Sequence, residues 1–586
     1  MVLGLKRKPK QEKQETQTED VVKPTFGESV AVLAYRYFGK FAKSLHKGMP
    51  EIATDILKSG MNYSPEVYLS LVLMITVLTI PIAALLLVAA IVFKLLPLAI
   101  FSVLPALVFG MGLSYPRLMA SSRASSLDEE LPFMIGYVTV LASGGVSPIM
   151  TLKRLSKVDL YPKSAMEARR ILMQIDVFSN DPISALEFAS RYNPNRVFAD
   201  FFGGYTSVLK TGGDVIDYMQ NKLRDVFAYR ALKVKSAADT IGTFAESYIS
   251  IAVILGIGLF VLFAVQAILG SASGAGGGSA GIQRIILLTT VFNPLVSALF
   301  IYITHSIQPK EPTRNLRPYY FFAGGLALIP VALFLPLHIS FVYKLAAGLT
   351  ASTLPASVVS IREARRKSSV ERMIPSFVRD IAEVRKTGLA PEKCIEQVST
   401  RNYGGLSPIV QSMASQLSWG VPLRQVLSTV RTKTKSWLTQ TVLFLLSEVV
   451  EVGGGTPEML GNLADFVEKI SQIEREKRSQ LRPYVFIPYF GAVMIVITTV
   501  LMVYFLTSPI VTGGGFNPFA SNLGNPASIT VPMLAGAVFT SWIMGFVSGK
   551  MGEGSVEAGF KHAAILAAVS GIVMFLATVF FHIPGV

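Results

Sequence analysis

Three consecutive glycines, Gly453, Gly454 and Gly455, stand just before the helical pattern that begins at Pro457. A glycine-rich loop that opens a helix can bind a phosphate, because its backbone N–H groups and the helix dipole both favour an anion. A nucleotide-binding P-loop also needs a Gly-Lys-Ser or Gly-Lys-Thr ending, and the sequence contains none. We therefore interpret the glycine run as a turn between helices.

Other residue types with catalytic or metal-binding chemistry are sparse. Cys394 is the single cysteine, which excludes an internal disulfide and a thiolate cluster. The histidines form no pair at metal-ligand spacing, and we expect isolated residues at interfaces or in solvent. They are His46, His305, His338, His562 and His582. The sequence therefore predicts no catalytic residue, metal site or cofactor, and we expect no enzyme activity.

The elements that carry these residues are apolar. Of 586 residues, 51% are hydrophobic and 16% are charged, whereas about 25% are charged in an average soluble domain. About 20 apolar residues cross a bilayer. Nine runs qualify: 67–93, 95–115, 248–269, 285–304, 319–337, 345–361, 484–506, 531–548 and 563–581. The predicted fold class is all-α, a polytopic membrane protein with about nine transmembrane helices and two duplicated cytoplasmic helical-bundle domains.

Loop charge predicts the orientation in the cell (cytoplasmic) membrane. Loops 269–283 and 508–530 are uncharged and belong outside, whereas the basic segments 308–318, 361–367 and 475–482 belong inside. Nine spans then leave the amino terminus in the cytoplasm and the carboxyl terminus outside. The net charge of +16 follows from such loops, so we expect a lipid bilayer and no nucleic acid as a partner.

The predicted spans divide the chain into eight regions. Within 26–66, Val30, Leu33, Tyr37 and Phe41 recur at helical spacing among lysines, which predicts a basic amphipathic helix that lies on the membrane or packs on a later domain. The regions are a disordered basic tail (1–25), an amphipathic helical region (26–66), a transmembrane hairpin (67–115), a first cytoplasmic helical domain (116–246), two transmembrane pairs (247–306 and 307–361), a second cytoplasmic helical domain (362–483) and three transmembrane helices (484–586).

The two cytoplasmic domains repeat one pattern. Each has two prolines sixteen positions apart, a glycine before the second proline, and a later glycine cluster. Proline suits the first position of a helix and glycine suits a tight reversal, so each copy is predicted to repeat a helix–turn–helix unit. The predicted turn markers are Pro132, Gly145, Pro148, Gly212 and Gly213 in the first copy, and Pro375, Gly388, Pro391, Gly453, Gly454 and Gly455 in the second.

The pattern "LPFM…ASGGVSP…TGGDV" and "IPSF…KTGLAP…EVGGGTPEML" resembles the type II secretion system F-domain family. Its members are the inner-membrane platforms of secretion systems, type IV pili and archaella. The additional helical pair before each domain, and the segment "SGKMGEGSVEAGFKHAAIL" at 548–566, resemble the archaeal branch, which includes archaellum assembly protein J and archaeal type IV pilus membrane platforms.

The resemblance implies a platform without catalytic chemistry. A hexameric secretion-type ATPase would dock on it, pilin or archaellin subunits would pass it into the filament, and it would form a homo-oligomer. Charge complementarity directs the ATPase contact to basic edges of the helical domains, although basic residues beside a span also follow from orientation alone and contact anionic lipid. The candidates are Arg362, Arg365, Arg366, Lys367, Arg431, Lys433, Lys435, Arg475, Lys477 and Arg478.

A polytopic transporter is the alternative function. It would need a charged or discontinuous site near the membrane midplane. No Asp, Glu, Lys or Arg lies near the centre of a predicted span, and no clear pair of broken helices is visible. Glu448 and Glu451 precede the glycine turn. They pair with a basic residue of a neighbouring helix or partner, or they form a solvated face.

Overall fold

The computed structural model describes the chain except for residues 1–25, 94–95, 178–180, 274–290, 309–315, 337–338, 508–526 and 582–586. The predicted tail 1–25 and most of the uncharged loops 269–283 and 508–530 therefore lie outside the described residues. The described part consists of helices and their connections, with no β-strand among its residues. The all-α prediction is confirmed.

Seven helical segments of the described part are long and apolar enough to cross a membrane. They are Pro65–Val92, Ile100–Ala142, Arg317–Phe334, Phe341–Arg385, Pro457–Tyr504, Thr530–Glu553 and Val556–Phe580. These segments overlap seven of the nine predicted runs. The other two, 248–269 and 285–304, extend into residues that are not fully described, although α9 (Val215–Ser273) covers the first and α11 (Asn293–Ile307) covers the end of the second.

One compact unit comprises residues 1–128 and 186–203. Its first elements are α1 (Phe26–Gly48), α2 (Glu51–Ser59), α3 (Pro65–Val92), the 3₁₀ helix η1 (Leu96–Val103) and the first part of α4 (Leu104–Ala142). Helices α3 and α4 pair closely, because the Tyr68 hydroxyl donates to the carbonyl of Gly112 at 2.6 Å. A Cβ on Gly112 would overlap Val72, so glycine permits this approach.

The second unit comprises residues 129–185 and 204–586, and the chain repeats one order of six helices. The first series is α4, α5 (Pro148–Leu155), α6 (Pro162–Asp176), α7 (Pro182–Tyr192), α8 (Arg196–Thr211) and α9. The second series is α14 (Phe341–Arg385), α15 (Pro391–Val398), α16 (Ser407–Ser418), α17 (Leu423–Lys433), α18 (Trp437–Gly453) and α19 (Pro457–Leu481), with η3 (Gly404–Leu406) before α16. The predicted duplication is confirmed.

The apolar part of the second unit adds α11, α12 (Arg317–Gly325), α13 (Leu328–Phe334), α20 (Phe486–Thr507), α21 (Ala527–Glu553) and α22 (Val556–Phe581), with η4 (Arg482–Val485) before α20. A Cβ on Gly545 would overlap the backbone of Ala563, and one on Gly549 would overlap that of Gly559. Small residues therefore allow α21 and α22 to pack backbone against backbone, as is common between membrane helices.

The run 319–337 departs from the expected continuous span. It forms two helices, α12 and α13, which are separated by a turn at Leu326 and Ala327. Gly324 and Gly325 precede the turn and weaken the helix there, because glycine loses the most backbone entropy in a helix. A Cβ on Gly325 would overlap the carbonyl of Ser352, so the backbone also approaches α14 closely at this point.

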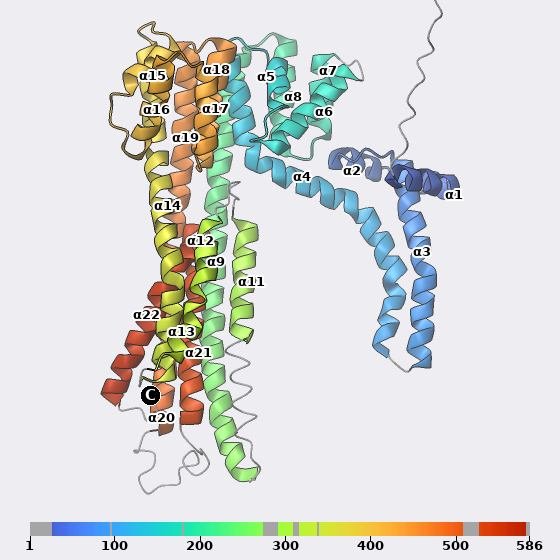
Figure 1. The fold of residues 1–586 in the computed structure, drawn as a ribbon. Coiled ribbons are helices and arrows are strands. Elements are labelled where there is room, and N and C mark those ends of the chain that lie inside the picture. Colours follow the sequence, from blue (N-terminus) through green and yellow to red (C-terminus); the bar gives the residue numbers. More distant parts are fainter. Residues whose placement is uncertain are drawn as a thin grey trace, which may run out of the picture. The chain divides into compact units, whose positions relative to one another are not determined.

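Two helices connect the helical domains to the apolar bundle without a break. Helix α9 has 59 residues and α14 has 45, which correspond to lengths of about 88 Å and about 68 Å at 1.5 Å per residue. Figure 1 shows α9, α14 and α19 running alongside one another from the helical domains toward the apolar bundle. The predicted borders at 246/247 and 361/362 therefore fall inside continuous helices.

Candidate functional site: the junction of the two helical domains

The helices of both domains begin and end largely as the markers predict. Pro148 and Pro457 occupy first-turn positions, and Ser147 and Thr456 each accept a backbone N–H at 3.3 Å. The Asp181 carboxylate accepts hydrogen bonds from the backbone N–H of Ser184 at 3.0 Å and from the Ser184 hydroxyl at 2.8 Å, and these bonds lower the pKa of Asp181. Pro391 also occupies a first-turn position, without a side-chain cap. The glycines with positive φ at these turns include Gly145, Gly212, Gly388, Gly454 and Gly455.

Pro132 and Pro375 are the exceptions. They were expected at turns, but they lie inside α4 and α14. A proline inside a helix loses one backbone hydrogen bond and costs about 3 kcal/mol. Both prolines are buried, and the neighbouring Ile374 and Phe377 are 1% exposed. Tertiary packing therefore holds these helices together across the prolines.

The triple-glycine turn uses its own amides. The N–H groups of Gly454 and Gly455 both donate to the carbonyl of Val449, which closes the end of α18. The Arg385 guanidinium donates to the carbonyl of Gly455 at 2.7 Å and to that of Leu389 at 2.6 Å. Since these amides cap a helix and a cation occupies the carbonyl side, the turn is built as a helix connection and not as a phosphate cradle.

Glu448 and Glu451 join the two helical domains. The Tyr137 hydroxyl of the first copy donates to Glu448 at 2.9 Å, and Arg154 lies 3.4 Å from the same carboxylate. Arg154 also lies 3.9 Å from Glu451, which pairs with Arg424 of its own copy at 2.8 Å. The side chain of Glu448 is 13% exposed. The sequence left open whether these acids pair with basic residues or form a solvated face. In the structure they pair with arginines of neighbouring helices.

Aromatic side chains fill the same junction. Phe133 meets Trp437 edge-on, with ring centroids 4.4 Å apart, and stacks on Tyr161 at 5.7 Å. The Tyr161 hydroxyl donates to Thr441 at 2.6 Å. Tyr161 is 2% exposed, and this burial raises its pKa above the ordinary value for tyrosine.

Two glycines of the first copy let the domains interlock. A Cβ on Gly136 would overlap the ring of Phe466, and one on Gly144 would overlap the sulfur of Met459. Phe466 and Met459 belong to α19 and are buried. The end of α4 can therefore approach α19 only because these positions lack a side chain.

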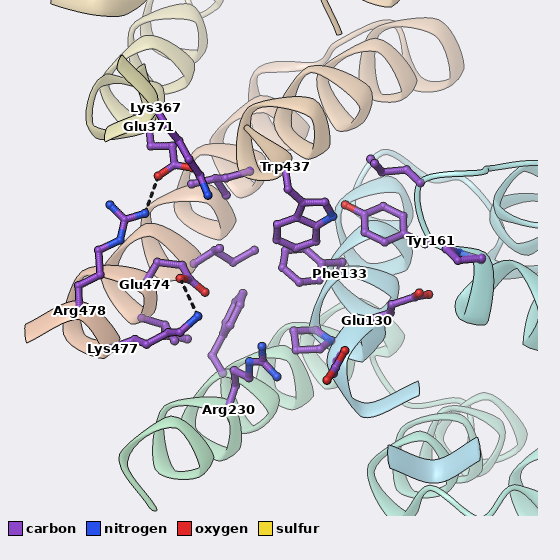
Figure 2. Close-up of a pocket in the computed structure, with 18 residues that line it drawn as sticks. Glu130, Phe133, Tyr161, Arg230, Lys367, Glu371, Trp437, Glu474, Lys477 and Arg478 are labelled. Carbon is purple, nitrogen blue, oxygen red and sulfur yellow. Dashed lines mark hydrogen bonds and ion pairs between the residues drawn. The ribbon is translucent and has the colours of Figure 1, made fainter. Parts of the chain in front are cut away.

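A cavity of about 170 Å³ lies beside the aromatic cluster (Figure 2). Phe133, Tyr161 and Trp437 form an apolar wall. On another side, Arg478 pairs with Glu371 at 2.7 Å and Lys477 pairs with Glu474 at 3.6 Å. These cations were candidates for ATPase docking, but here they contribute to intramolecular ion pairs at the junction.

The structure separates the predicted basic residues into two groups. Five have acidic partners: Lys367 and Arg478 with Glu371, Lys435 with Glu363, Arg475 with Glu468, and Lys477 with Glu474. Arg431 lies 5.9 Å from the ring centre of Phe444, a cation–π contact. Arg362, Arg365 and Arg366 on α14 and Lys433 at the end of α17 are exposed, with no ion-pair partner among the described residues.

Arg372 extends the exposed group on α14 and was not predicted. Together with Arg365, Ser368 and Ser369 it lines a shallow hollow that reaches Gly404. Arg362, Arg365 and Arg372 are spaced three and seven residues apart, which puts them on one face of a helix. That spacing was present in the sequence and would have identified Arg372. We call Arg362, Arg365, Arg366 and Arg372 the α14 arginine face.

The segment 548–566 forms a buried polar network that the sequence reading also missed. His562 is 6% exposed. Its Nδ1 lies 2.8 Å from the Tyr489 hydroxyl, and its Nε2 lies 3.1 Å from Glu553, which also pairs with Lys561. The expectation of an isolated histidine is wrong here. The network ties the turn between α21 and α22 to α20.

Comparison with known proteins finds a family model that matches both helical domains and the apolar helices that follow them. The family model for the type II secretion system protein F matches the chain twice, over residues 134–263 and 377–504. Tyr137 and Arg154 lie in the first range, and Glu448 and Phe466 lie in the second. Each match continues from helical domain into apolar helix, as α9 does in the structure.

Two similar proteins come from Methanocaldococcus jannaschii. An uncharacterized protein is 24% identical over 505 residues, which cover 79% of this chain and 82% of the relative. Flagella accessory protein J is 20% identical over 432 residues, which cover 67% of this chain and 72% of the relative. No solved structure gives a significant match. The two matches to the model of the type II secretion system protein F family fall on two series of helices in the same order, so the chain contains two regions that are similar to this family.

Proposed function

We propose that this protein is the integral membrane platform on which an archaellum or a type IV pilus-like filament is assembled. A hexameric secretion-type ATPase docks on its helical domains, and the resulting motion inserts pilin-like subunits into the filament. The platform acts as a homo-oligomer and performs no catalysis itself. The family match and the similarity to Flagella accessory protein J support the assembly role.

The observation that carries this proposal is the continuity of α9 and α14. Each helix begins or ends in a helical domain and runs into the apolar bundle as one element. The junction holds the two domains together through buried aromatic contacts and the Tyr137–Glu448–Arg154 cluster. A force on the domains is therefore transmitted to the membrane mainly along α9, an uninterrupted helix without proline, whereas α14 contains Pro355 and Pro375.

The α14 arginine face is the proposed ATPase contact. The other predicted cations, apart from Lys433 and Arg431, have acidic partners within the chain, so their charge is already balanced locally. The charge of the exposed arginines is not neutralised by an ion-pair partner among the described residues, so they are available to an acidic surface of the ATPase. Such complementary charges increase the association rate of two proteins and fix their relative orientation. Arginine also binds carboxylates in a bidentate geometry that lysine cannot form.

Co-purification of the full chain with the secretion-type ATPase of the same cell tests the proposal. We expect a complex at low salt that weakens as salt rises, because exposed charges are screened. The variant Arg362→Glu/Arg365→Glu/Arg366→Glu should reduce binding strongly. Failure of the unmodified chain to bind the ATPase would refute the docking role.

The matched control makes the same change of charge elsewhere in the second domain. Lys386, Lys393 and Lys469 are exposed, and the first two form surface pairs with neighbours three residues away, which contribute little to stability. The variant Lys386→Glu/Lys393→Glu/Lys469→Glu should bind the ATPase normally. Equal losses in both triple variants would show that overall charge, and not the α14 arginine face, controls binding.

A transporter would share one feature with the described part of the chain, the interrupted span formed by α12 and α13. The interruption faces α14, where Gly325 packs against the backbone at Ser352. This close packing explains the break without a substrate site, so we do not propose transport.

A further inference from the structure

Helix α1 already has one face covered. Ala31, Ala34 and Ala42 are at most 4% exposed, and Ala42 belongs to a buried cluster with residues of α2 and of the start of α3. Glu66, in the first turn of α3, accepts the Tyr35 hydroxyl at 3.0 Å and lies 3.9 Å from Lys43. This face fixes α1 to α3.

A second face of α1 is apolar and uncovered. Leu33, Tyr37 and Phe41 follow one another at intervals of four residues, so they form one strip along the helix. Tyr37 and Phe41 are each 70% exposed. A contiguous apolar strip of this kind marks a surface that meets another apolar phase.

Cations border this strip. Arg36, Lys40 and Lys47 are exposed and have no ion-pair partner among the described residues. At 100° per residue they lie beside Leu33 and Tyr37 on the helix circumference. The nearby acids of α2 are occupied, because Arg117 binds Glu51 and Asp55, each at 2.7 Å. The free charge beside the apolar strip is therefore positive.

The position of α1 indicates what covers the strip. Its partners on α3 are Tyr68, Leu69 and Val72, which lie in the first turns of a 28-residue apolar helix. Figure 1 shows α1 lying across that end of α3. If α3 crosses the bilayer, its end is at the bilayer surface, and α1 lies in the plane of that surface. An apolar strip with flanking cations is the pattern of an interfacial helix.

We propose that α1 is an interfacial membrane helix that recognises an anionic leaflet. Leu33, Tyr37 and Phe41 insert at the level of the headgroups, where aromatic residues are favoured. Arg36, Lys40 and Lys47 bind the phosphates of anionic lipids. This contact is separate from filament assembly, since it needs neither the ATPase nor a filament subunit.

The test uses the full chain in vesicles. On a Cys394→Ala background, Tyr37→Cys and Phe41→Cys each carry an environment-sensitive fluorophore. Vesicles consist of phosphatidylcholine with or without phosphatidylglycerol. With phosphatidylglycerol, we expect quenching by lipids that carry a spin label near the headgroup and protection from aqueous iodide. The control Arg196→Cys, at a side chain that is 93% exposed, should show the opposite pattern.

The charge requirement is tested with Arg36→Gln/Lys40→Gln/Lys47→Gln in the same labelled chains. Lipid quenching at position 37 should depend on phosphatidylglycerol in the parent and lose that dependence in the triple variant. Equal lipid quenching with and without phosphatidylglycerol in the parent would refute recognition of anionic lipid.

Two other results would overturn the membrane contact itself. Quenching of position 37 by iodide to the same extent as position 196 would show that the strip faces water. Protection from both iodide and the spin-labelled lipids would show that a protein surface, from a partner or a second copy of the chain, covers the strip.

Discussion

The substitution Gly136→Ala tests whether the two helical domains are interlocked as the structure describes. The added Cβ would fall within 3.0 Å of three ring carbons of Phe466, whereas carbon atoms pack at about 3.5–4.0 Å. Phe466 is 2% exposed and contacts the rings of Phe133 and Phe227. Its ring therefore cannot move aside without displacing other buried side chains.

Two effects of opposite sign set the expected magnitude. Overpacking a well-filled core costs about 1–3 kcal/mol, and an overlap this large belongs at the upper end. Alanine in place of glycine inside a helix recovers about 1 kcal/mol. The free energy of unfolding should therefore fall by about 2 kcal/mol.

Gly461→Ala is the matched control. Gly461 lies inside α19, and a Cβ at this position would have nothing within 4 Å. Only the helix-propensity effect remains, so the free energy of unfolding should rise by about 1 kcal/mol. Denaturant unfolding of the purified full chain, followed by circular dichroism, gives both values. If Gly136→Ala matched the stability of Gly461→Ala, the close packing of α4 on α19 would be refuted.

Two further predictions concern the junction and the cysteine. Glu448→Gln removes the charge that Arg154 pairs with in a nearly buried site, and we expect a loss of about 2 kcal/mol. The same change at Glu468, whose side chain is 42% exposed and pairs with Arg475, should cost less than about 1 kcal/mol, so equal losses in denaturant titrations would contradict the junction. Cys394 is fully buried, and burial raises the pKa of its thiol. Because the thiolate is the reactive form, a chromogenic disulfide reagent should label it only on unfolding, and rapid labelling of the native chain at neutral pH would contradict that burial.

Local signals in the sequence predicted the helix ends well. Pro148 and Pro457 stand at helix starts, and Gly145 and Gly454 stand at helix ends with positive φ. These outcomes depend on neighbouring residues alone: a missing N–H does no harm in the first turn, and glycine adopts a left-handed conformation without strain. The prediction of a turn at Pro375 was wrong because it also relied on local preference alone. The local preference of Pro375 is to start a helix, but burial with its neighbours outweighs that preference.

The sequence did not predict which basic residues have acidic partners. Arg362 and Arg478 look alike in the sequence, since each belongs to a basic run beside a predicted span. In the structure Arg478 pairs with Glu371, 107 positions away, whereas Arg362 has no ion-pair partner in the described part of the chain. No local pattern contains that information, because the partner is brought in by the packing of α14 against α19.

By itself, the sequence determined the helical class, most of the apolar spans and the duplication, because hydrophobic run length and turn residues act over short distances. Tertiary structure alone decided that Glu448 and Glu451 join the two copies, that Gly136 and Gly144 admit the side chains of α19, and that His562 is buried. These features arise between residues that are remote in the chain. The free energy that favours them comes from surfaces that become complementary only after the helices have packed.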